Sequence, residues 1–174
     1  YGSEVEIKET DAMVENAVAL LQEALKEIPD ASKQAYLEAL KRVPLLVERE
    51  CEPIAFLRCE KYDARAAAHR LVAYWEARKK WFGPDRAFLP MTQTGAMAED
   101  MEYAEKGLTT MLPDDDHGRP VVCWDRVRSM AAVIPRASVL RCGFYFFQVL
   151  SEQERAQKRG CVLMINYRVS GAAV

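Results

Sequence analysis

In the first half of the chain, apolar residues recur at the spacing of amphipathic helices. Between residues 11 and 28 they follow the i, i+3, i+4 and i+7 pattern, and Pro29 ends the run. A second helix that carries Tyr36, Leu37, Leu40 and Val43 is predicted to run to Pro44. Two shorter helical segments begin at Pro44 and Pro53. Because proline favours the first turn of a helix, both short segments start where a helix is expected to start.

The longest predicted helix of this half runs from Ala64 to Phe82, with Asp63 as its N-cap. Gly83 and Pro84 then end it, as is common after a helix C-terminus. Its apolar face is formed by Ala68, Leu71, Val72, Trp75 and Phe82. Together with the preceding helices, it predicts an all-α helical bundle over residues 1–90, with the segment 84–94 as the boundary loop.

The second half changes from helical to strand-like periodicity after a short helix predicted over residues 95–106. Residues 108–112 and 120–126 read as strands of an antiparallel hairpin, joined by a turn-rich linker. A single long helix is predicted from Pro135 to Arg159, followed by the apolar run 161–165, which is typical of a strand covered on both faces. Strand, helix and strand predict a parallel pair, so residues 91–174 are expected to form an incomplete α/β domain with a small mixed sheet.

Charge and cysteine usage narrow the classes of function. Lys and Arg total 24 against 26 Asp and Glu, so no overall positive field favours nucleic acid. The longest apolar runs are interrupted by Arg141 and Gln148 and are too short to span a membrane. The five cysteines are odd in number, scattered and without a CxxC pair, which favours reduced thiols over a zinc site. These features predict a soluble, cytoplasmic protein.

Three segments in sequence order carry a resemblance to a known family. The first is Phe56 to Asp63 with the following helix that contains Trp75 and Arg78. The second is the hairpin from Leu112 to Val121, and the third is the helix from Val139 to Gly160 with the strand 161–167. Together they resemble the CRAL-TRIO lipid-binding family over about residues 32 to 171.

This resemblance implies a helical bundle followed by an α/β domain whose sheet floors an apolar cavity closed by a mobile helix. Such proteins bind or transfer phospholipids, phosphoinositides, retinoids or tocopherols without catalysis. The chain is expected to stop before the family's remaining strands and gate helix, so its pocket is expected to be incomplete. Asn166, where an acid is usual, and Val169, where glycine is usual, depart from the family pattern and leave the local turn geometry open.

Candidate lipid contacts lie on the long helix and on the last strand. Leu140, Phe144, Phe147 and Ser151 share one helix face, and the resemblance implies a lipid-binding set of Leu140, Gly143, Phe144, Phe147 and Ile165. Alternatively, this face packs on the sheet as ordinary core. The large aromatics could also fill the cavity, which would leave a protein-interaction or regulatory module that keeps the fold without binding lipid.

Other chemistry finds less support in the sequence. Arg119, Arg126, Arg128, Arg136 and Arg141 could meet anionic headgroups, although an ordinary solvated surface is favoured because acids are interspersed. His69 and His117 lack a visible acid–base partner, and the acidic run 114–116 lacks the spacing of a calcium loop and is expected to be solvated. We therefore expect no enzyme, no cofactor and no metal. The expected partners are a hydrophobic lipid and, transiently, a membrane surface, with no nucleic acid and a monomer at full length.

Overall fold

The computed structural model of the protein describes residues 7–127 and 134–166. The chain divides into two compact units, a helical unit over residues 1–90 and a mixed unit over residues 91–174. Val169 and Arg128, which were singled out in the sequence, lie outside the described residues. The fold is therefore mixed helix and strand, and all strands among the described residues lie in the second unit.

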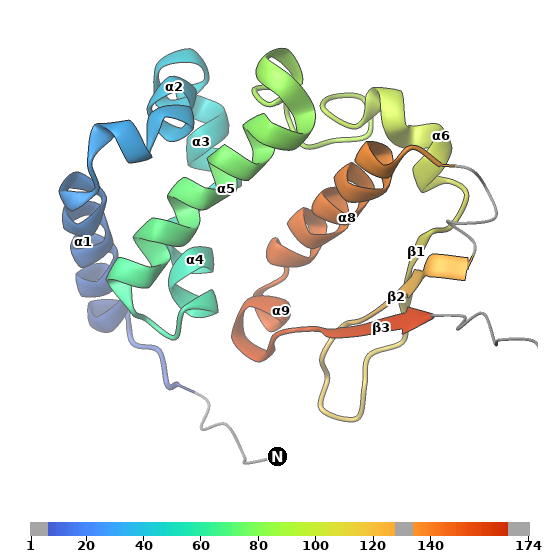
Figure 1. Ribbon diagram of the computed structural model, residues 1–174. Coiled ribbons are helices and arrows are strands. Elements are labelled where there is room, and N and C mark those ends of the chain that lie inside the picture. The colour runs from blue at the N-terminus through green and yellow to red at the C-terminus, as the bar shows by residue number, and fades with distance from the viewer. Residues whose placement is uncertain (1–6, 128–133, 167–174) are drawn as a thin grey trace, which may run out of the picture. The chain divides into compact units, whose positions relative to one another are not determined.

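The helical unit contains the predicted sequence of helices (Figure 1). Their bounds are Asp11–Glu27 for α1, Gln34–Arg42 for α2, Pro44–Glu50 for α3, Pro53–Cys59 for α4 and Ala64–Arg86 for α5, with a short 3-10 turn at Asp30–Ser32. Pro44 and Pro53 lie in the first turns of α3 and α4, as predicted. Helices α1, α2 and α4 all pack against α5, which forms the centre of the unit.

Local signals in the sequence explain both ends of α5. The Asp63 side chain accepts a hydrogen bond from the Ala66 backbone N–H at 2.9 Å, which confirms the predicted N-cap. At the other end Gly83 has a φ of +77°, a conformation that suits glycine and breaks the helix before a last turn that reaches Arg86. The predicted apolar face of α5 is buried, and Trp75 is fully enclosed.

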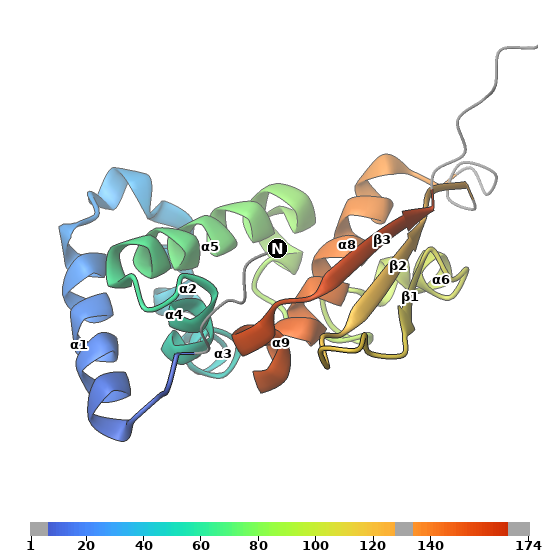
Figure 2. The same cartoon turned by 90° about the horizontal axis from the view of Figure 1, so that it is seen from below.

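The mixed unit is built on a three-stranded sheet in the order β1, β2, β3 (Figure 2). The strands are Thr109–Leu112, Val121–Asp125 and Val162–Asn166, and the helical segments are the 3-10 turn Ala98–Asp100, α6 at Met101–Ala104, α8 at Arg136–Ser151 and α9 at Glu154–Arg159. β1 and β2 pair antiparallel, and β2 and β3 pair parallel. The predicted hairpin and the predicted parallel pair are both confirmed.

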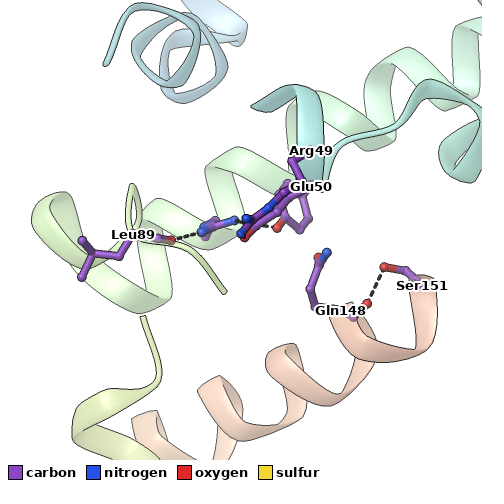
Figure 3. A network of polar contacts seen from close by, with 7 residues as sticks. Arg49, Glu50, Leu89, Gln148 and Ser151 are labelled. Carbon is purple, nitrogen blue, oxygen red and sulfur yellow. Dashed lines mark hydrogen bonds and ion pairs between the residues drawn. The ribbon is translucent and has the colours of Figure 1, made fainter. Parts of the chain in front are cut away.

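The prediction of one continuous helix from Pro135 to Arg159 is wrong, because α8 ends at Ser151 and α9 begins at Glu154. The Ser151 hydroxyl donates a hydrogen bond to the Gln148 carbonyl at 2.7 Å (Figure 3). In a continuous helix this carbonyl accepts a hydrogen bond from a backbone N–H. Gln153 between the two helices is extended. A side chain that competes with the backbone for a carbonyl therefore accompanies the break.

The prediction that the last strand is covered on both faces is also wrong for the described part of the chain. Leu163, Met164 and Ile165 of β3 are between 40% and 52% exposed, although successive residues point to opposite faces. β3 lies at one edge of the described sheet and has only β2 as a neighbour. Its apolar run is therefore accessible on both faces and does not form a core.

Candidate functional site

One face of the sheet gathers apolar side chains from all three strands. The pairing places Met111 opposite Val122, Val122 beside Leu163, and Trp124 beside Ile165. Because side chains alternate along a strand, these five residues point to the same side. We call them the Ile165 face: Met111, Val122, Trp124, Leu163 and Ile165.

The Ile165 face is anchored in the centre and open at its margins. Val122 on the central strand is buried, at 1% exposure, and Trp124 is half-buried. Met111 on β1 is 39% exposed, and Leu163 and Ile165 on β3 are exposed to a similar or larger degree. A group of large apolar side chains that remain exposed together is typical of a surface that binds a protein, a membrane or a ligand.

The predicted lipid-binding residues of the long helix share one side of α8. We call Leu140, Gly143, Phe144 and Phe147 the α8 stripe. Leu140 and Phe144 are half-buried, Phe147 is 44% exposed, and a Cβ added at Gly143 would meet no atom within 4 Å. The stripe is therefore partly accessible.

Helix α8 buries residues on more than one side. Ser138 and Cys142 are buried one turn apart, on a face roughly opposite to the α8 stripe, whereas Leu150 is buried close to the side of Gly143. Among the strands, α8 lies closest to β1, whereas Ile165 belongs to β3 at the other edge of the sheet. The α8 stripe and Ile165 thus lie on separate elements, and a shared pocket stays a prediction.

Of the five members of the Ile165 face, only Ile165 was among the lipid contacts predicted from the sequence. The period-2 pattern of the last strand placed Leu163 on the same side as Ile165, but it could not place the residues of the other two strands beside them. Each strand shows alternation, but alternation alone does not say which residue of one strand lies beside which residue of the next. That register depends on the hairpin loop and on the crossover through α8 and α9. The period-2 pattern of each strand indicates which of its residues share a face, but it does not give the register between neighbouring strands.

Arg141, predicted within a basic stretch, is held by a buried carboxylate. Its Nε and Nη2 atoms donate to the two oxygens of Asp100, both at 2.7 Å, and Nη2 also reaches the Ser138 hydroxyl at 3.2 Å. Asp100 is only 1% exposed. Its hydrogen bonds hold the pKa of Arg141 above the usual value, so this cation stays charged and fixed in place.

The acidic hairpin turn is structured by its own hydrogen bonds, which departs from the expectation that it is simply solvated. The Asp115 carboxylate accepts from the backbone N–H groups of His117 and Arg119 and from the Arg119 side chain. These hydrogen bonds hold the pKa of the Asp115 carboxyl below its usual range, and the bonds from Arg119 have the largest effect. Asp114 forms an ion pair with Arg155, which connects the turn to α9.

The helical unit contains a buried ionic network around Arg78. This side chain is fully buried, and Nη1 donates to Glu50 and, at 2.8 Å, to the Tyr74 hydroxyl, while Nη2 donates to the Leu89 carbonyl. The guanidinium also lies 4.9 Å from the centre of the Trp75 ring. Glu50 and Leu89 mark the two ends of the network in Figure 3. Arg78 therefore joins α3, α5 and the segment after α5.

The Cys51 thiol gives a pH-dependent prediction for this unit. Burial raises its pKa from 9.0 to about 12, so the folded protein keeps the thiol protonated where the unfolded chain ionises it. The contribution of the protonated Cys51 thiol to the free energy of unfolding is fully present below pH 9 and is lost as the pH rises toward 12. Between pH 9 and pH 10 we expect the wild type to lose about 1 kcal/mol more unfolding free energy than Cys51→Ala. Urea unfolding at both pH values measures this, and equal losses would contradict it.

Other candidate chemistry is sparse in the described residues. His69 lines a pocket of about 270 Å³ between α1 and α5, together with Ala24, Glu27, Ile28, Pro29 and Arg65. Within residues 7–127 and 134–166, no group of three or more His, Cys, Asp or Glu side chains is placed to hold a metal ion. Over the same residues, no helix combines the length and apolar character needed to cross a bilayer. The Ile165 face is therefore the strongest candidate site.

Comparison with known proteins gives no independent support for an assignment. Neither a family model nor a curated protein matches this sequence.

Proposed function

We propose that the mixed unit binds a hydrophobic, lipid-like ligand without catalysis. The observation that carries this proposal is the Ile165 face, where all three strands contribute apolar side chains and three of the five remain substantially exposed. Apolar sites in proteins are lined mainly by such side chains, with few polar groups to set orientation. The partly accessible α8 stripe extends the candidate contacts to Leu140, Gly143, Phe144 and Phe147.

The driving force would be the transfer of apolar surface from water. Each methylene of a bound chain that leaves water contributes about 0.8 kcal/mol. The exposed parts of Met111, Leu163 and Ile165 would gain from the same burial. Covering this face therefore favours the complex from both sides, and no covalent step is needed.

Matched variants on β3 test the proposal. The delipidated chain is incubated with vesicles of phospholipid, sterol and diacylglycerol, re-isolated, and analysed for bound lipid by mass spectrometry. We expect Ile165→Asp to lose at least about tenfold of the bound lipid, because a charge cannot be buried cheaply against an apolar ligand. Met164→Asp is the control, since Met164 is equally exposed on the same strand but points to the other face.

Two outcomes would contradict the proposal. One is that the wild type recovers no lipid, and the other is that both variants retain the wild-type amount. Phe147→Asp adds a test of the α8 stripe, because its side chain is exposed and its loss should leave the helix intact. If only Phe147→Asp reduces binding, the ligand lies on α8 and the Ile165 face is not the site.

A protein-interaction role is the second candidate, and the edge position of β3 favours it. An edge strand leaves backbone groups on one side for pairing with another chain, and this strand carries no charge or proline to discourage pairing. In that case the chain would carry no lipid and would self-associate or bind a partner through β3. Light scattering of the wild type and of Leu163→Lys would detect self-association that depends on this edge.

A further inference from the structure

We infer that β3 pairs with β3 of a second copy of this chain, antiparallel and around a twofold axis, so that two three-stranded sheets become one. The pairing rests on the interaction role proposed above, for which it supplies the partner, and does not depend on lipid binding by the Ile165 face. Leu163, Met164 and Ile165 of β3 are between 40% and 52% exposed at an edge of the described sheet. A neighbouring strand would cover part of all three side chains.

The backbone of β3 is oriented to accept this strand. Along a strand, the N–H and C=O groups of alternate residues point to opposite sides. The Val162 N–H donates to the Pro120 carbonyl at 2.8 Å, so Val162 is directed toward β2. The N–H and C=O groups of Leu163 and Ile165 therefore point to the outer edge. Another strand can pair with these groups without disturbing the pairing between β2 and β3.

The two edges of the sheet differ in how they oppose pairing with a second copy. Pro113 and the acids 114–116 follow β1 directly, so a twofold contact at that edge would bring like charges together. Residues 161–166 contain neither a charged residue nor a proline. Because a twofold contact sets a strand against itself, every charge on the strand would meet its own kind. The uncharged edge at β3 is therefore the one that suits a second copy.

Complete overlap of the two strands gives the register. The strand Val162–Asn166 is centred on Met164, so complete overlap places Met164 opposite its counterpart and Leu163 opposite Ile165 of the other copy. Leu163 and Ile165 then form the hydrogen-bonded pairs, whereas the Met164 side chains meet in a non-hydrogen-bonded pair, where side chains lie closer together. A twofold contact closes on itself, so the expected assembly is a dimer and not a filament.

A lysine at the twofold position tests the pairing. Sedimentation velocity of the full chain over a range of concentrations is expected to show a monomer–dimer equilibrium for the wild type. Met164→Lys places like charges directly opposite each other and should weaken the dimer at least about fivefold. Leu112→Lys is the matched control, because Leu112 is 37% exposed on the same sheet face but on β1 at the other edge. This control should dimerise as the wild type does.

Opposite charges at the same position separate repulsion from misfolding. Met164→Glu alone should also dimerise weakly, but an equal mixture of labelled Met164→Lys and unlabelled Met164→Glu should associate more tightly than either variant alone, because opposite charges then face each other. A mixture that does not associate, a wild type that stays monomeric, or equal weakening by Leu112→Lys would each overturn the inference. Growth beyond the dimer would overturn it as well, since only an open-ended contact continues to add copies. Lipid recovery by the same variants is measured separately, so loss of the dimer and loss of lipid binding remain distinguishable.

Discussion

Replacing Arg78 with alanine is expected to destabilise the helical unit by about 3 kcal/mol, because breaking a buried ion pair by removing one partner is strongly destabilising. Glu50 is 6% exposed and would lose its close guanidinium partner, while its longer contact with Arg49, at 3.9 Å, involves a side chain that is 67% exposed. The Tyr74 hydroxyl and the Leu89 carbonyl would lose their donors at the same time. Hydrogen exchange of amides in α5 measures the opening free energy of this unit directly, which avoids assuming one transition for both units.

An exposed pair in the same unit supplies the control for Arg78. Arg65 lies 3.3 Å from Glu27, but its side chain is 79% exposed, so Arg65→Ala is expected to cost less than about 1 kcal/mol. The double variant Glu50→Leu with Arg78→Met should be more stable than Arg78→Ala, because no buried charge is left alone. If Arg78→Ala cost no more than Arg65→Ala, the network would not hold the unit together.

The features that could be predicted from the sequence are those fixed by neighbouring residues. Helix starts at Pro44 and Pro53, the cap at Asp63 and the break at Gly83 each follow from the preferences of one or two side chains. The hairpin also follows from its turn-rich linker. These signals act over a few residues, so reading the chain locally is sufficient to find them.

The features that escaped prediction depend on residues far apart in the chain. Asp100 and Arg141 are 41 positions apart, and nothing near Arg141 indicates that a buried carboxylate engages it. The register that assembles the Ile165 face likewise spans residues 109 to 166. The break after Ser151 is local, but a serine near a helix end is equally compatible with a continuous helix. For this reason the elements could be predicted better than the candidate site.

Replacing Arg141 with alanine is expected to destabilise the mixed unit by about 3 kcal/mol, the lower end of the range for a broken buried pair. The lower end is appropriate because the Arg141 side chain keeps 16% exposure, whereas Asp100 is almost completely enclosed. The change removes two charge-assisted hydrogen bonds that join α8 to the 3-10 turn Ala98–Asp100. Faster hydrogen exchange in α8 and β1, with unchanged exchange in α5, would report this loss.

Arg136→Ala is the matched control, since Arg136 is an exposed residue at the start of the same helix and its loss should change stability by less than about 0.5 kcal/mol. Lipid recovery distinguishes two roles of Arg141, namely pairing with Asp100 and binding anionic headgroups. If the guanidinium serves Asp100, Arg141→Ala that remains folded recovers the same lipids as the wild type. If it serves anionic headgroups, as its place in the basic stretch allowed, the variant loses phosphatidic acid selectively and retains its stability. The bidentate geometry with Asp100 favours the first result, because a guanidinium bound on two donors has little capacity left for a phosphate.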